Sequence, residues 1–257
     1  MPPLLEAALN GARTPAEHPG IPRTPPELAA AARAAAGAGA EIVHVHAYDG
    51  GQETLAPAAC AATVSAIRAA CPGVPISLTT SAAIEADPRR RLDLVSAWTE
   101  LPELVTANMG EPGVAELGQL LAARGVGVEA GLLSLADAES FIRAQLAGLC
   151  VRVLVEPLDR EPSAAVAHAE AIEALLAGAG VKLEQVHHGD GIASWAVNRR
   201  ALSRGHGIRT GLEDTVLLPD GQLAVDNAQL IRIAAAMRLE TITASPSRSR
   251  RRRPGSR

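Results

Sequence analysis

Two histidines separated by a single residue are the clearest candidates for chemistry in this sequence. His44 and His46 lie in a segment whose β-branched residues Ile42, Val43 and Val45 are typical of a buried strand. Side chains alternate between the two faces of a strand, so both imidazole rings are expected on the same face. Two imidazoles held by one rigid strand suit a transition metal, most often zinc. The alternative is two polar residues at a strand end, hydrogen-bonded to neighbours or to water.

A second cluster of charged residues lies far downstream, in the segment 209–214. If this segment reaches the two histidines, Glu213 could complete a His-His-Glu set around zinc and leave positions open for a substrate. Asp214 could pair with Arg209 and fix its guanidinium group. From the spacing alone, an ion pair that only closes the fold at this point is an equally valid interpretation.

The segments that would position these residues alternate between strand and helix patterns. Strands are expected at about residues 4–10, 41–49, 75–80, 104–108, 126–132, 151–155, 183–187 and 208–212. Helices are expected at about residues 25–36, 56–70, 88–98, 114–124, 136–146, 163–176, 193–203 and 227–238. This alternation predicts a closed (β/α)8 barrel, the TIM-barrel fold. An open doubly wound sheet is the alternative, but it usually has a Gly-x-Gly-x-x-Gly segment after the first strand, where this chain has Gly11 alone.

In such a barrel the active site lies at the carboxyl ends of the strands. The polar residues expected to ring this mouth are Asn10, His44, His46, Thr79, Thr80, Ser81, Thr106, Asn108, Glu129, Glu156, His187, His188, Asp190, Arg209, Glu213 and Asp214. His187 and His188 could be further ligands. The simpler expectation is that the backbone satisfies one of them and the other faces solvent. Tyr48 and Asp49 could anchor a loop or support the metal-binding histidines.

Composition limits the class of protein. Of the 257 residues, 47% are hydrophobic and only 2% are aromatic, so the core must consist of Leu, Val, Ile and Ala. Three cysteines are too few and too dispersed for a disulfide framework, and the first residues lack a signal-peptide pattern. We therefore expect a cytoplasmic protein. No apolar run reaches the roughly 18 residues of a membrane span.

Charge separates a body from a tail. The formal net charge is −4, but the last 17 residues contain six arginines and no acidic residue, which leaves the rest at −10. An acidic body argues against nucleic-acid binding. We expect one TIM-barrel domain over residues 1–240 and a disordered, dispensable arginine-rich tail over residues 241–257. The alternative is a tail that contacts RNA or membrane phosphates.

Together, several segments resemble the β-keto acid cleavage enzymes, a family of zinc-dependent TIM barrels, from about residue 4 to residue 236. The segments are Leu9–Ala12, Ile42–His46, Thr106–Asn108, Arg209–Asp214 and Asp226–Leu230. The resemblance implies that His44, His46 and Glu213 bind Zn²⁺, and that Arg209 with Asp214 deprotonates the substrate. The expected substrate contacts are Thr79, Ala82, Thr106, Asn108 and Arg13.

The resemblance also implies a reaction. Members condense a β-keto acid with acetyl-CoA and release acetoacetate and a new acyl-CoA. A β-keto acid held by zinc through its keto oxygen and carboxylate loses a C2 proton more easily, because the enolate charge falls on an oxygen beside the metal. The enolate then attacks the thioester, and a retro-Claisen cleavage follows without a covalent enzyme nucleophile.

Other functions remain open at this point. The alternatives are a zinc-dependent aldolase or hydrolase on the same barrel, and a non-catalytic binding protein, because fold alone does not decide function. The expected partners are a small β-keto acid, acetyl-CoA and further copies of the chain in a dimer or tetramer. Neither nucleic acid nor membrane is expected to bind the body.

Three departures from the family member with an amino substrate concern the substrate. Arg13 stands where that member has Glu, Thr79 where it has Ser, and Gly131 where it has a second acid on the fifth strand. Loss of both acids speaks against a cationic amino substrate. At the mouth, Arg13 would repel an ammonium group and attract a carboxylate or a hydroxylated tail. The alternative is that Arg13 pairs only with a loop acid such as Glu17.

Overall fold

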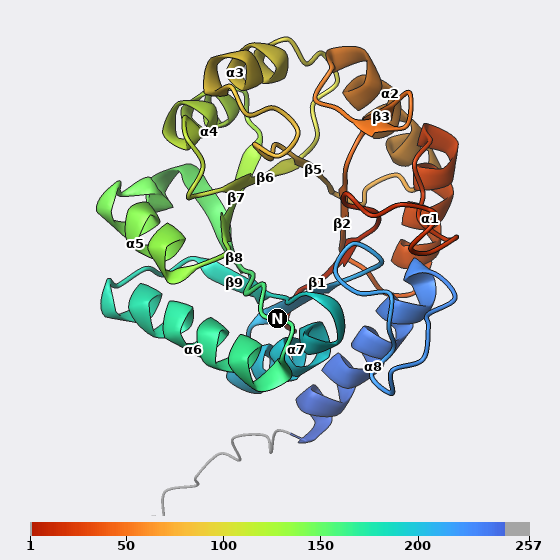
Figure 1. Cartoon of the computed structure of the whole chain (residues 1–257), viewed down its shortest axis with the longest axis vertical. Coiled ribbons are helices and arrows are strands. Elements are labelled where there is room, and N and C mark those ends of the chain that lie inside the picture. Colours follow the sequence, from red (N-terminus) through yellow and green to blue (C-terminus); the bar gives the residue numbers. More distant parts are fainter. Residues whose placement is uncertain (1, 245–257) are drawn as a thin grey trace, which may run out of the picture.

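The computed structural model describes residues 2–244, which form a closed barrel of eight parallel strands (Figure 1). The strands are β1 (Leu5–Ala8), β2 (Ile42–Val45), β5 (Ile76–Thr79), β6 (Leu104–Asn108), β7 (Gly127–Leu132), β8 (Cys150–Val155), β9 (Glu184–His187) and β10 (Gly207–Thr210). Each pairs with the next along the chain, and β10 pairs with β1, where Leu5 lies opposite Ile208. The barrel is the TIM-barrel fold that the alternation predicted, and the closing pair rules out an open sheet.

Helices surround the barrel on all sides (Figure 1). In the described part of the chain they are α1 (Pro25–Gly37), α2 (Pro57–Ala70), α3 (Pro88–Ser96), α4 (Val114–Ala123), α5 (Leu135–Arg143), α6 (Pro162–Gly178), α7 (Ser194–Arg204) and α8 (Asn227–Ala244), with short 3-10 turns at Leu146–Leu149 and Gly191–Ala193. Helix α1 begins as its sequence predicts. The Thr24 hydroxyl accepts from the Glu27 amide and the Glu27 carboxylate accepts from the Thr24 amide, which forms a capping box.

The apolar core lies between the strands and the helices. Strand residues such as Val43, Leu78 and Val153 are fully buried there, and so are the large rings of Trp98 and Trp195. The inside of the barrel is different, because its middle is largely polar rather than filled by Val, Ile and Leu. The polar residues that meet inside it are Glu6, Ser77, Thr106, Glu129, Arg152 and Arg209.

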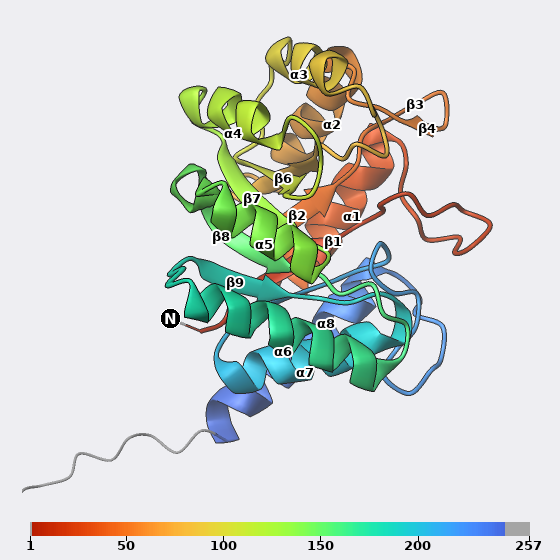
Figure 2. The same ribbon diagram turned by 60° about the vertical axis from the view of Figure 1, so that its left-hand side comes forward.

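A β-hairpin that the sequence did not predict follows β2. Its strands are β3 (Tyr48–Asp49) and β4 (Gln52–Glu53). Both turn glycines, Gly50 and Gly51, have positive φ, as a two-residue type I′ turn requires. The Arg23 guanidinium lies 4.5 Å from the centre of the Tyr48 ring and fastens the hairpin to the loop after β1. Figure 2 shows hairpin and loop at the same end of the barrel.

The last helix extends beyond the expected end of the domain. Helix α8 continues to Ala244, so the first residues of the segment expected as a disordered tail are helical. The rest of that segment, 245–257, lies outside the described residues. In the described part, no helix is long and apolar enough to cross a membrane. The three cysteines are free.

Gly211 stands where β10 closes against β1. A Cβ at this position would overlap the carbonyl group of Ala8, which belongs to a central strand and cannot move aside. We expect Gly211→Ala to lower the free energy of unfolding by about 2 kcal/mol, measured by urea denaturation. Gly178→Ala is the control, because its added carbon meets no atom within 4 Å. Equal stability of both variants would contradict the prediction.

Candidate active site and metal centre

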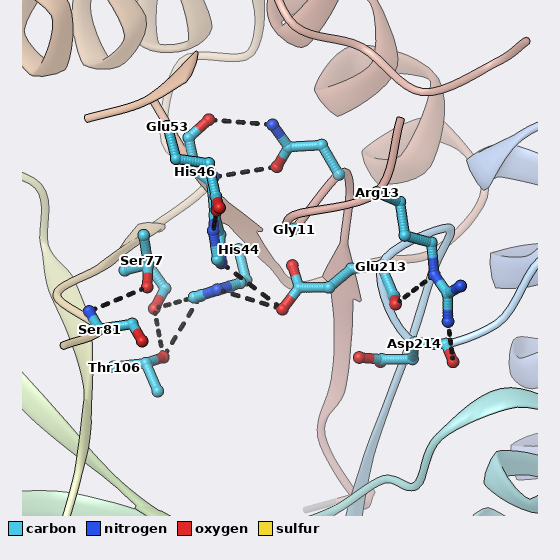
Figure 3. Close-up of polar contacts among 12 residues, drawn as sticks. Gly11, Arg13, His44, His46, Glu53, Ser77, Ser81, Thr106, Glu213 and Asp214 are labelled. Atoms are coloured by element: carbon cyan, nitrogen blue, oxygen red, sulfur yellow. Dashed lines mark hydrogen bonds and ion pairs between the residues drawn. The ribbon is translucent and has the colours of Figure 1, made fainter. Parts of the chain in front are cut away.

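The three predicted metal ligands meet at the carboxyl end of the barrel. Figure 3 shows the rings of His44 and His46 pointing toward the carboxylate of Glu213. The Nε2 atom of each histidine lies 3.6 Å from Oε1 of Glu213. Among the described residues, this is the one group of three or more His, Cys, Asp or Glu ligand atoms within 4.8 Å of one another. Two imidazole nitrogens and a carboxylate oxygen suit a divalent transition metal.

In each ring, Nδ1, the nitrogen that does not face Glu213, has a hydrogen-bond partner. Nδ1 of His44 lies 3.2 Å from Oγ of Ser77 and 3.3 Å from Oγ1 of Thr106. Nδ1 of His46 lies 2.5 Å from Oε1 of Glu53 on the hairpin. Metal-binding histidines are typically held in this way, with the second nitrogen bonded to a carboxylate or another oxygen. The arrangement leaves both Nε2 atoms directed at one point.

The two histidines differ in protonation. Burial lowers the pKa of His44 to about 3, so its ring is neutral. In His46 the effect of burial is outweighed by the Glu213 and Glu53 carboxylates, which raise its pKa to about 9. A metal binds neutral imidazole, so metal binding must displace a proton from His46 at neutral pH.

Close packing fixes Glu213 in place. Its side chain lies against Gly11 after β1, where a Cβ would overlap it, and the positive φ of 56° at Gly11 also favours glycine. The Arg209 guanidinium lies 3.2 Å from Oε1 of Glu213. Burial raises the pKa of Glu213, but the charge of Arg209 and the charge and hydrogen bond of the protonated His46 outweigh that effect and hold it well below its ordinary value. The carboxylate is therefore ionised, as a metal ligand must be.

Beside the ligands lies a second group of charges. Arg209 is 2.7 Å from Oδ1 of Asp214, so the expected pair of side chains is in contact. His188 lies 3.4 Å from the same oxygen of Asp214 and 3.3 Å from Oε2 of Glu156. Although burial lowers the pKa of His188, the carboxylates of Glu156 and Asp214 raise it to about 9. This group therefore holds two cations, Arg209 and His188, among the carboxylates of Glu156, Asp214 and Glu213.

The expected substrate contacts lie at or near the carboxyl ends of β1, β5 and β6. Thr79 ends β5 and is buried, and Ala82 is partly exposed in the turn that follows. Thr106 is also buried, and its hydroxyl group faces a metal-ligand histidine rather than open space. The Asn108 amide donates to Glu111 at 2.9 Å. Thr79, Ala82 and Asn108 are thus the members of the set whose side chains make no bond to the metal-ligand residues.

Arg13 lies at the mouth and also pairs with a loop acid. Its guanidinium donates to the Glu213 carbonyl at 2.8 Å, to Asp190 at 3.2 Å and to Glu17 at 3.5 Å. With Arg160 and Asp190 it lines an open surface pocket of about 300 Å³. Arg13 thus pairs with Glu17 and also contacts the backbone of a predicted metal ligand.

The expectation for the paired histidines was wrong. His187 and His188 are both buried, and neither faces solvent. His187 stacks on His206, with ring centres 4.8 Å apart, whereas His188 contacts Glu156 and Asp214 at the mouth. Consecutive strand residues point to opposite faces, which separates the two rings.

Some members of the site were missed in the sequence. Glu53 was missed because the hairpin was not predicted, although Gly50 and Gly51 between polar residues are a turn signal. Ser77 and Glu6 lie inside strands rather than at their ends. Their role depends on which strands face one another across the barrel, and no local pattern reports that.

Fold and site together define a (β/α)8 barrel with a candidate His-His-Glu metal centre at the carboxyl ends of its strands. The model of the beta-keto acid cleavage enzyme family matches residues 2–252, and the chain belongs to this family. The predicted family is therefore confirmed. The chain is 28% identical, over 271 residues and 96% of each sequence, to the 3-keto-5-aminohexanoate cleavage enzyme of Fusobacterium nucleatum subsp. nucleatum.

Solved structures share the barrel. ObcA, in a ternary complex with a C4-CoA adduct and oxalate, matches with a TM-score of 0.70 and 18% identity over 86% of this chain, which spans 64% of the ObcA chain. The 3-dehydroquinate dehydratase of Aquifex aeolicus VF5 matches with a TM-score of 0.60 and 12% identity, over 92% of this chain and 98% of that one. At such identities these likenesses concern the fold alone.

We expect the purified protein to bind about one zinc ion per chain, and His46→Ala to lose it while the barrel stays folded. The ligands line the mouth rather than the core, so the variant removes a donor without opening a cavity between strands and helices. Zinc affinity of the unmodified protein should increase between pH 6 and pH 9, because the His46 proton competes with the metal. Metal analysis and chelator competition provide the measurements.

The control is His168→Ala. This histidine is on α6, where it pairs with Asp159 at 2.8 Å outside the proposed ligand set. It should keep the full zinc content. Full zinc retention in His46→Ala would refute the ligand assignment.

Proposed function

We propose that the protein is a zinc-dependent β-keto acid cleavage enzyme that condenses a β-keto acid with acetyl-CoA and releases acetoacetate and a new acyl-CoA. The observation that carries this proposal is the convergence of His44, His46 and Glu213 beside the Arg209–Asp214 pair. Family membership supports the reaction class. The CoA adduct bound by ObcA, a protein of similar fold, supports a CoA thioester as the second substrate.

The metal would be held by Nε2 of His44, Nε2 of His46 and a carboxylate oxygen of Glu213. Zn²⁺, when bound there, supplies Lewis acidity for the keto group of the substrate. The donor set fits this ion, because both imidazoles are oriented by hydrogen bonds at Nδ1 and the carboxylate is ionised. Three protein ligands leave room for a substrate, as in other catalytic zinc sites.

Asp214 is the proposed base that removes the C2 proton. Arg209 holds its Oδ1 atom at 2.7 Å, whereas its Oδ2 atom is buried and has no hydrogen-bond partner in the described structure. A buried carboxylate oxygen without a donor is ready to accept a proton. By holding Oδ1, Arg209 fixes the orientation of the carboxylate and therefore the position of Oδ2.

The remaining steps need positioning and charge stabilisation. The carbanion formed at C2 attacks the thioester carbonyl of acetyl-CoA and expels the CoA thiolate. The thiolate then adds to the original keto carbon, and cleavage of the C2–C3 bond gives the new acyl-CoA and the C2 carbanion of acetoacetate, which takes up a proton. Arg209 and the protonated His188 place positive charge next to the developing anions. We propose Thr79, Ala82, Thr106 and Asn108 as contacts that orient the substrate carboxylate and keto group.

The substrate is proposed to be a neutral or anionic β-keto acid. Arg13 is the residue at the mouth that would meet the substrate tail, and it lies where an acid would be needed to bind an ammonium group. Its charge is partly offset by Asp190 and Glu17. The effect on selectivity should accordingly be moderate.

Two other functions make different predictions for the same assays. A zinc-dependent aldolase or hydrolase would act without acetyl-CoA. A non-catalytic binding protein would bind a ligand without turnover. Neither alternative has a specific observation in its favour. The buried, unpartnered oxygen of Asp214 beside the metal ligands suits a catalytic base, and a protein that only binds a ligand does not require it.

The test is acetyl-CoA-dependent release of acetoacetate from a panel of β-keto acids. We expect Asp214→Asn to lower kcat by a factor of about 10²–10⁴, because it removes the general base, while zinc content stays the same. Asp220→Asn, in an exposed turn, is the control and should keep full activity. Turnover that is independent of acetyl-CoA would favour the aldolase or hydrolase, and absence of turnover with every acid would refute the proposal.

A second measurement addresses substrate charge. We expect Arg13→Gln to raise kcat/KM for an amino β-keto acid relative to a neutral one by roughly 5- to 50-fold, equivalent to about 1–2 kcal/mol for the loss of a nearby cation. Glutamine is preferred to glutamate here, since a new carboxylate would face Asp190 and Glu17 directly. A ratio that does not change would show that Arg13 does not face the substrate.

A further inference from the structure

A line of polar contacts runs from a metal ligand into the interior of the barrel. Nδ1 of His44 lies 3.2 Å from Oγ of Ser77, and this hydroxyl group donates to Oε2 of Glu129 at 2.5 Å. The other oxygen of Glu129 accepts from Arg152 at 3.2 Å. Glu129 is fully buried and lies too deep in the barrel to be one of the metal ligands. A buried carboxylate that is not a metal ligand needs another role.

The directions of these hydrogen bonds follow from the chemistry of a carboxylate. An ionised carboxylate only accepts, so the Ser77 proton must point to Glu129. The Ser77 oxygen then has only lone pairs left for His44, and Nδ1 of His44 must be the donor. Thr106 acts in the same sense: its hydroxyl group also donates to Glu129, so its oxygen, 3.3 Å from Nδ1 of His44, is left to accept.

These bond directions hold when Glu129 is the ionised member of the buried carboxyl pair that it forms with Glu6. Burial raises the pKa of both Glu6 and Glu129. The pKa of Glu129 remains raised, although the hydrogen bond from Ser77 and the charge of Arg152 lower it. Glu6 has no donor at either oxygen, and its pKa is raised to about 8. Donors reach both oxygens of Glu129 and neither oxygen of Glu6, so the geometry places the charge on Glu129 and the proton on Glu6.

Arg152 anchors the carboxylate from the opposite side. Its Nη1 atom pairs with Glu129, and its Nε atom lies 3.3 Å from Glu184, at the amino end of β9. Strand register places Glu129 beside Arg152 and Arg152 beside Glu184. The carboxylate thus has a fixed position, which is what a positioning residue requires.

We propose that Glu129 is a positioning residue of the metal centre, which holds His44 in the Nδ1–H tautomer through the hydroxyl groups of Ser77 and Thr106. The tautomer leaves the lone pair on Nε2, the atom that faces Glu213 and His46. The inference deepens the proposed function, since it rests on the same ligand set. It assigns a role to a carboxylate that touches neither metal nor substrate.

The first measurement uses the unmodified, metal-free protein. Long-range ¹⁵N–¹H NMR spectra, with the His44 signals assigned by comparison with His44→Gln, report which ring nitrogen carries the proton. We expect His44 to be neutral, with the proton on Nδ1. A proton on Nε2 would overturn the proposal without any variant.

The second measurement is zinc affinity of Glu129→Gln by competition with a chromophoric chelator. The neutral amide can donate to Ser77 as well as accept, so the tautomer is no longer enforced. We expect a mixture of His44 tautomers and a zinc dissociation constant increased about 10- to 100-fold. An unchanged tautomer and an unchanged dissociation constant would overturn the proposal.

Further variants separate positioning from stability. Ser77→Ala should weaken zinc binding in the same direction, and Ser77→Thr should restore it, because the threonine keeps the hydroxyl. Thr80→Val is the control: it removes a buried hydroxyl from the same strand end, but that hydroxyl donates to the Thr106 carbonyl and not to His44. If Thr80→Val weakens zinc binding as much as Ser77→Ala does, the effect is one of packing and the proposal fails.

The outcomes distinguish this inference from the proposed function. A protein that binds zinc with the expected tautomer but cleaves no β-keto acid would refute the function and support the role of Glu129. An active enzyme whose zinc affinity and His44 tautomer do not respond to Glu129→Gln would support the function and refute that role.

Discussion

The structure depends on one constraint: residues from both ends of the chain must meet at a single point. His44 lies in β2 and His46 directly after it, Glu213 follows β10, and only β1 lies between these strands in the closed barrel. The pairing of Ala8 with His44 and of Ala7 with Thr210 sets how far along the barrel axis the histidines and Glu213 lie. A shift of one residue in either pairing would turn a ligand away from the mouth. Barrel closure and site assembly are therefore the same event.

A second constraint is the charge inside the barrel. Buried ions are tolerated only when they are paired, and removal of one partner is far more harmful than loss of both. Arg209 lies within ion-pair distance of Asp214, Glu213 and Glu156, and Glu129 lies against Arg152. The interior therefore contributes little to stability compared with the apolar layer under the helices. These ion pairs instead hold the side chains at the barrel mouth in fixed positions.

Sequence reasoning recovered what depends on local periodicity. The alternation of strand and helix patterns predicted the barrel, and the two-residue repeat predicted that His44 and His46 share a face. The predicted ligand set meets because strand ends in a barrel converge. The pairing of Ser77 with Glu129 was beyond the sequence, since it depends on register across β5, β6 and β7. The role of Glu53 was hidden for another reason: a short hairpin outside the barrel carries it.

The order of the ligands along the chain has a consequence during synthesis. The two histidines emerge from the ribosome long before Glu213, and the strand that carries the preceding Arg209 is the last of the barrel. A growing chain therefore exposes two of the three ligands with no carboxylate to complete the set. The whole centre can exist only after the final strand has paired with the first. Occupancy of the complete site is thus a signature of finished chains, and a fragment that ends before β10 has no means of reproducing it.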